Sequence, residues 1–68
     1  MDYALMVKNL RNKMMLTQQE LADKLSVTFE TINRWENSKF MPTMKLRRKL
    51  SALFKKYGIE EIYKKYEE

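Results

Sequence analysis

Apolar residues recur every three or four positions along most of the chain, which is the spacing of one face of an α-helix. A first helix is predicted from a cap at Asp2 to about Met14. Its apolar positions are Leu5 or Met6, Val7, Leu10 and Met14.

Two shorter helices with their own start signals are predicted next. Thr17 and Glu20 fit a capping box, in which the threonine hydroxyl accepts from the Glu20 N–H and the Glu20 carboxylate reaches back. Thr28 caps a further helix that ends near Asn37. The inward positions are Leu21, Ala22 and Leu25 on the first of the pair, and Ile32 and Trp35 on the second. Two short helices separated by a few residues have helix-turn-helix geometry, predicted here at about residues 17–37.

A fourth helix is predicted to start at Pro42 and Thr43 and to end at Gly58, which can adopt the left-handed stop conformation. Its apolar stripe is Leu46, Leu50, Leu53 and Phe54. A short last helix from Ile59 to Tyr66 turns inward Ile59, Ile62 and Tyr63 or Tyr66. With one glycine, one proline and no alternating strand pattern, the chain is predicted to be all-α.

A chain of 68 residues allows one domain, spanning 1–68, and 44% hydrophobic residues suffice for its core. The absence of cysteine and histidine removes disulfides, the usual zinc sites, and thiol or imidazole catalysis. No catalytic residue, metal or cofactor is therefore predicted. The longest apolar run, Tyr3–Val7, is far shorter than the roughly 20 residues that cross a bilayer. With no signal-peptide pattern at the start, a cytoplasmic location is the expectation.

Positive charge is concentrated in the middle of the chain. The net charge is +5, but residues 34–56 hold eight Lys and Arg residues against Glu36 alone. Such a segment favours a polyanionic partner, most commonly nucleic acid, although a solvated basic helix face has the same composition.

The motifs T-Q-x-E-L-A, from Thr17 to Ala22, and I-x-x-W-E-N, from Ile32 to Asn37, resemble the Cro/CI-like (XRE-type) helix-turn-helix family. Lambdoid phage repressors are familiar members. The resemblance covers about residues 5–58 and implies a compact five-helix, lambda-repressor-like domain. It implies a transcriptional repressor or regulator of phage or prophage type, whose third helix reads the DNA major groove, usually as half of a homodimer on a palindromic operator.

This chain departs from the family where members commonly place glycine. It has Met15, Ser26 and Ser38 at those turns. If the residues keep a positive φ, each costs about 1 kcal/mol relative to glycine. Alternatively, the turns have a different conformation.

With Ile32 and Trp35 turned inward, the opposite side of the third helix carries the candidates for base readout, which are Thr28, Phe29, Glu30, Asn33 and Arg34. Arg34 can bind guanine O6 and N7 bidentately, or pair with Glu30 one turn earlier. Glu30 can orient Arg34 or accept from cytosine N4. Phe29 can contact a thymine methyl or pack against the next loop.

The candidates for phosphate binding are Gln18, Asn37, Lys39, Thr43 and Lys45. Gln18 begins a helix, where free N–H groups and the dipole favour an anion. The others lie around the loop after the third helix, where family members commonly clamp the DNA backbone. Arg47 and Arg48 are weaker candidates because a helical base can simply be solvated. Arg11 and Glu36 occupy positions that form an ion pair in some family repressors.

Two other classes of function compete with double-stranded DNA binding. An antitoxin-like or docking module could keep this fold and use the face of Ile59, Ile62, Tyr63 and Tyr66 for a protein partner. An enzyme is the weakest alternative, since the paired glutamates near the end lack a neighbouring nucleophile or phosphate loop.

Overall fold

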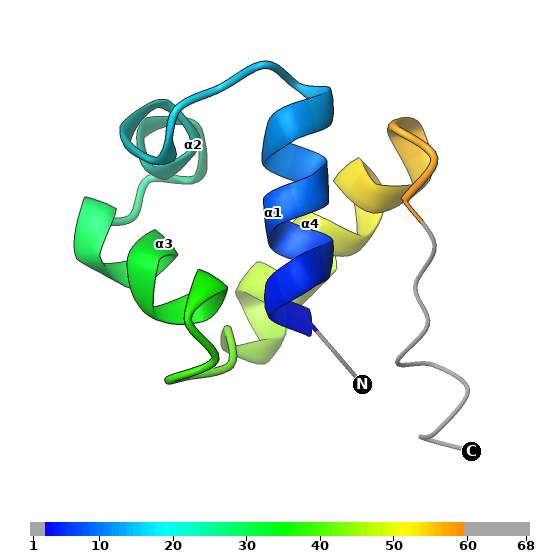
Figure 1. Cartoon of the computed structure of the whole chain (residues 1–68). Helices are drawn as coiled ribbons and strands as arrows, with labels where there is room; N and C mark the ends of the chain where they lie inside the picture. The colour runs from blue at the N-terminus through cyan, green and yellow to red at the C-terminus, as the bar shows by residue number, and fades with distance from the viewer. Residues whose placement is uncertain (1–2, 60–68) are drawn as a thin grey trace.

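The computed structural model describes residues 3–59, which form four helices and no strand. The helices are α1 (Tyr3–Lys13), α2 (Gln18–Leu25), α3 (Phe29–Glu36) and α4 (Met44–Lys56). Figure 1 shows α2 and α3 on one side of α1, with α4 crossing behind it. This confirms the all-α class and the predicted helix-turn-helix. No helix in this part of the chain is long and apolar enough to span a membrane.

The predicted count of five helices is not supported. The last predicted helix spans Ile59–Tyr66, but Ile59 is not helical and the rest lies outside the described residues. The proposed docking face of Ile62, Tyr63 and Tyr66, and the predicted cap at Asp2, also lie outside them. Ile59 itself is partly buried and packs against the core.

The core is built from one face of each helix. Leu10, Leu21, Ile32 and Leu50 are fully buried and come from α1, α2, α3 and α4 respectively. Each lies on an apolar face predicted from periodicity. In α1 the choice between Leu5 and Met6 is settled by burial, because Met6 is 4% exposed and Leu5 is 50% exposed.

The starts of α2, α3 and α4 match the predicted caps. Glu20 N donates to the Thr17 hydroxyl at 3.1 Å, and Thr17 N donates to the Glu20 carboxylate at 2.8 Å, which completes the capping box. At α3 the Thr28 hydroxyl accepts from Thr31 N, and at α4 the Thr43 hydroxyl accepts from Leu46 N. These caps satisfy N–H groups that have no partner inside their own helix.

All four helices end in the same backbone arrangement, the Schellman motif. In α2, Val27 N donates to Ala22 O at 2.9 Å and Ser26 N donates to Asp23 O at 3.2 Å. The same pair of hydrogen bonds closes α1, α3 and α4. The motif needs a residue in the left-handed conformation just past the helix. That residue is Met15, Ser26, Ser38 or Gly58, in chain order.

Three of these left-handed residues carry a side chain. Met15, Ser26 and Ser38 each have φ of 59°, so the turns keep the conformation that favours glycine. Each accepts a local strain of about 1 kcal/mol. The structure thus selects the first of the two alternatives predicted for these turns.

Candidate nucleic-acid interface

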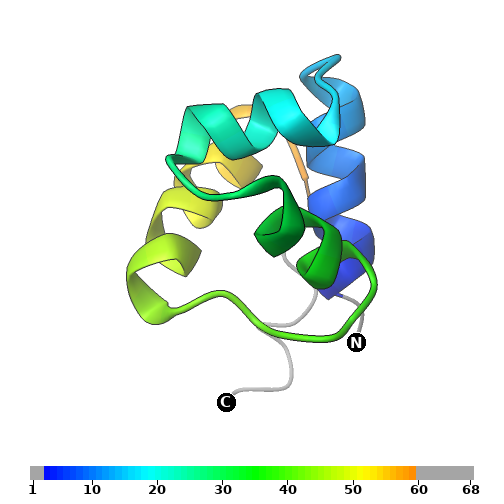
Figure 2. The same ribbon diagram turned by 90° about the vertical axis from the view of Figure 1, so that its left-hand side faces the viewer.

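The helix α3 has a buried side and an exposed side. Ile32 is fully buried and Trp35 is 4% exposed, as their spacing predicts. Figure 2 turns the α2–α3 side of the molecule toward the viewer, with α2 above α3 and the connection 37–43 passing below. The side of α3 opposite to Ile32 and Trp35 is not covered by the described chain, because Phe29, Glu30, Asn33 and Arg34 are all exposed.

The residues predicted to read bases share this exposed side or its start. Phe29 is 44% exposed, so it does not pack fully against the next loop. Thr28 is exposed, and its hydroxyl lies 2.9 Å from that of Thr31. The side chains of Thr28 and Thr31 are therefore already engaged in capping the helix, and a contact with DNA would add to this role.

Arg34 lies against a residue that sequence reasoning missed. Its guanidinium carbon is over the ring of Phe40, 5.5 Å from the centroid, which is a cation–π contact. Within residues 3–59 the predicted alternative, an ion pair with Glu30, does not form. Phe40 comes from the connection after α3, and the reversal of the chain at that point brings its ring to Arg34.

A buried carboxylate holds the inner end of α3. The Glu36 side chain is 2% exposed and lies 2.8 Å from Arg11 Nε. Arg11 Nη2 donates to the second carboxylate oxygen at 3.1 Å, so the pair is bidentate. Gln18 Nε2 donates to that same oxygen at 2.9 Å. The structure thus brings together α1, the start of α2 and the end of α3 at one carboxylate.

The charge of Arg11 is stabilised by this arrangement. The hydrogen bond to Glu36 raises the pKa of the Arg11 guanidinium above its ordinary value, and the negative charge of Glu36 acts in the same direction. Partial burial opposes both effects. Arg11 also donates to Leu16 O at 3.2 Å, which ties the end of α1 to the same cluster.

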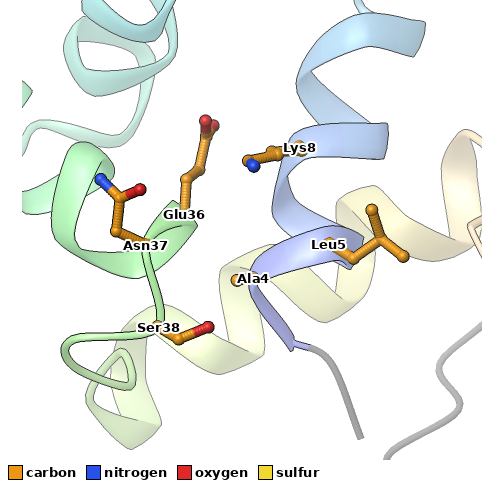
Figure 3. Close-up of a pocket in the computed structure, with 6 residues that line it drawn as sticks. All are labelled: Ala4, Leu5, Lys8, Glu36, Asn37 and Ser38. Atoms are coloured by element: carbon orange, nitrogen blue, oxygen red, sulfur yellow. The ribbon is translucent and has the colours of Figure 1, made fainter.

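Figure 3 shows the outer edge of this cluster, a surface pocket between the start of α1 and the end of α3. The Lys8 side chain points from α1 toward the Glu36 side chain, while Leu5 points away. Ala4, Asn37 and Ser38 complete the lining. No group of three His, Cys, Asp or Glu side chains that could hold a metal ion gathers within residues 3–59.

The predicted phosphate ligands differ in whether their side chains already form hydrogen bonds within the protein. The Gln18 amide donates to Glu36, and the Asn37 amide donates to the Asn33 carbonyl and to the Asn33 side chain. The Thr43 hydroxyl caps α4. Lys39 and Lys45 are exposed, and neither has a charged partner in the described part of the chain. The two lysines are therefore the members of the set whose donors are available without rearrangement.

Comparisons with known proteins agree with this geometry. A family model described as helix-turn-helix matches residues 7–62. An uncharacterized HTH-type transcriptional regulator of Archaeoglobus fulgidus is 39% identical over 57 residues, which cover 84% of this chain and 79% of that protein. No solved structure matches the chain significantly.

Proposed function

The chain belongs to the XRE-type helix-turn-helix family, and on that premise we propose that it is a transcriptional regulator that binds double-stranded DNA. The observation that carries this proposal is that one side of α3 is exposed while the opposite side is buried in the core through Ile32 and Trp35. The exposed side bears Phe29, Glu30, Asn33 and Arg34. A helix presented in this way fits the major groove of B-DNA, which is about 12 Å wide.

In this arrangement Arg34 supplies the strongest sequence reading. Its guanidinium fork matches guanine O6 and N7 and is worth about 1–3 kcal/mol of discrimination against another base. Phe29, at the start of the helix, meets a thymine methyl group. Glu30 and Asn33 flank them on the same side and select among the neighbouring bases.

Phosphate contacts set the position of α3 along the duplex. Lys39 places a cation within the connection 37–43, and Lys45 places a second one in the first turn of α4. The free N–H groups at the start of α2 bind a further phosphate, with the Gln18 amide fixed beside them by Glu36. These contacts bind all sequences alike and make affinity fall with salt.

The regulator is proposed to act as a repressor of the phage or prophage type, as a homodimer on a palindromic operator. This part rests on the family resemblance of the helix-turn-helix motif. A dimer would place a second α3 about one helical turn of DNA away, so that the operator repeats its half-site with that spacing.

Selection of bound sequences from a random pool of duplex DNA tests the proposal. The expected result is enrichment of one motif, as two inverted half-sites if the protein binds as a dimer. Gel-shift titration then compares the enriched duplex with a scrambled one at low and moderate salt. Equal affinity for both duplexes under all conditions would contradict sequence-specific binding.

Two single variants separate base readout from phosphate binding. Arg34→Ala should lower the preference for the selected duplex, while Lys39→Ala should weaken binding to all duplexes and lower the salt slope by about one. Both side chains are exposed, so neither change should move the melting temperature. If both variants weakened all duplexes by the same factor, the assignment of Arg34 to a base would be wrong.

A further inference from the structure

The connection after α3 exposes the aromatic ring of Phe40 at a surface position where a polar side chain would favour the solubility of the protein. Phe40 is 61% exposed and has no place in the core cluster. Its ring lines a surface pocket with Thr31, Arg34 and Trp35, all from α3. An exposed phenylalanine fixed beside a helix by the cation it touches calls for a reason beyond stability.

Backbone geometry explains how Phe40 reaches Arg34. Lys39 N donates to Arg34 O at 2.9 Å and Ser38 N donates to Trp35 O at 3.2 Å. With Ser38 in the left-handed conformation, the chain reverses and runs back beside the last turn of α3. Phe40, which follows Lys39, therefore lies against the side chain of Arg34 instead of continuing away from the helix.

We propose that Phe40 is a positioning residue for base readout, whose ring holds the Arg34 guanidinium ready for guanine. The proposal rests on the proposed function, namely that Arg34 contacts a base. The Phe40 ring has no hydrogen-bonding acceptor atom of its own, so the cation–π contact restrains the guanidinium while its N–H donors remain able to bind an acceptor on a base. Within the described chain, no hydrogen bond or ion pair engages the Arg34 donors.

The ring acts by reducing the freedom that Arg34 must lose on binding. A long exposed arginine samples many rotamers and gives up that freedom when it forms two hydrogen bonds to one base. The cation–π contact with Phe40 restricts the side chain before DNA arrives. The benefit applies only to the bidentate contact, so it should appear as base preference and not as general affinity.

The experiment measures how much affinity depends on guanine N7. The selected duplex is compared with one that carries 7-deazaguanine at the position read by Arg34, which removes the N7 acceptor and keeps the rest of the base. For the wild-type protein, the ratio of the two affinities should be clearly above one. Phe40→Leu keeps an apolar side chain without a ring and should lower this ratio about threefold, the effect of an exposed cation–π contact. Phe40→Trp should keep or raise the ratio, because tryptophan provides the strongest cation–π face.

The Arg34→Ala background distinguishes this proposal from the proposed function. There the ratio should be close to one, and adding Phe40→Leu should leave it unchanged. If Arg34→Ala lowers the ratio but Phe40→Leu does not, Phe40 has no positioning role and the proposed function stands. If Arg34→Ala itself leaves the ratio unchanged, Arg34 does not read this guanine and both assignments are overturned.

A measurement on the free protein provides a second readout. The Arg34 Nε–Hε resonance should lie upfield in the wild type through the ring current of Phe40 and move downfield in Phe40→Leu. The melting temperature should stay unchanged, since the ring is mostly exposed. An Arg34 resonance that does not respond to Phe40→Leu would overturn the proposed positioning of Arg34 by Phe40.

Discussion

The ends of α2 and α3 share one backbone motif but differ in the residue that comes directly after it. After α2, the left-handed Ser26 leads to Val27, which is partly buried and packs against the core. After α3, the left-handed Ser38 leads to Lys39, which is exposed. The apolar contact that commonly accompanies this motif is thus present at the first end and missing at the second.

The end of α3 is held by charge instead. Glu36, the last residue of α3, is buried and accepts hydrogen bonds from Arg11 and Gln18. These contacts hold the end of α3 in place, as the packing of Val27 against the core does after α2. Because the anchor is internal, the residues after α3 are available for another purpose. The same backbone motif thus places an apolar residue on the core after α2 and a basic residue on the proposed DNA surface after α3.

The largest effect is expected from removing the charged anchor of α3. Arg11→Met strands the buried Glu36 carboxylate and should lower the free energy of unfolding by about 3 kcal/mol. Replacing both partners, as in Arg11→Met with Glu36→Leu, should recover part of this loss, since no buried charge then remains. Urea unfolding monitored by Trp35 fluorescence measures both.

The matched control for this change is Lys13→Met, on the exposed part of α1, which should change stability little. Because the folded pKa of Arg11 is raised, the stabilisation from its charge is complete at every pH below its unfolded pKa. It is lost only as pH rises through the still higher folded pKa, so neutral pH leaves it intact. Equal unfolding midpoints for Arg11→Met and Lys13→Met would show that the end of α3 needs no such anchor.

An intermediate effect is expected from exchanging the residues that come after the two motifs. Val27→Lys removes an apolar contact with the core and should cost about 2 kcal/mol of stability. Lys39→Val should leave the unfolding midpoint unchanged but weaken binding to every duplex, with a shallower salt dependence. Fluorescence anisotropy with labelled DNA at two salt concentrations measures the second result. A stability loss in Lys39→Val as large as that in Val27→Lys would remove the contrast between the two ends.

The smallest effect is expected from relieving the left-handed serines. Ser26→Gly and Ser38→Gly should each stabilise the domain by about 0.5–1 kcal/mol, because glycine adopts a positive φ without strain but has a more flexible unfolded state. Each should raise the melting temperature by about 4 °C in a thermal melt. If neither variant gained stability, the serines would not be strained and the shared motif would carry no such cost.

Local signals explain how much of the fold could be predicted. The capping box at Thr17 and the inward spacing of Ile32 and Trp35 depend on residues close in sequence, and the structure confirms both. The family resemblance predicts the positions of the three unusual turns but leaves open whether they keep a positive φ, and the structure shows that they do. Periodicity alone left Leu5 and Met6 open, because both lie near the edge of the same helical face.

Tertiary contacts explain what could not be predicted. The sequence predicts Gln18 as a phosphate ligand because it begins a helix, and only the approach of α3 shows that its side-chain amide donates to Glu36. Phe40 lies in a loop that runs from polar to apolar residues, and its contact with Arg34 emerges only where the chain reverses after α3. The phosphate and base assignments stay predictions, since they concern a partner that sequence patterns describe only by its charge and groove shape.

Protection of guanine N7 from dimethyl sulfate is the direct test of base readout by α3, because N7 lies in the major groove and is the acceptor assigned to Arg34. On the selected duplex, the wild-type protein should protect one guanine per half-site, and Arg34→Ala should lose this protection at protein concentrations that still saturate the DNA. Protection that persists in Arg34→Ala, or a wild-type complex that leaves every guanine N7 reactive, would contradict readout by the exposed side of α3.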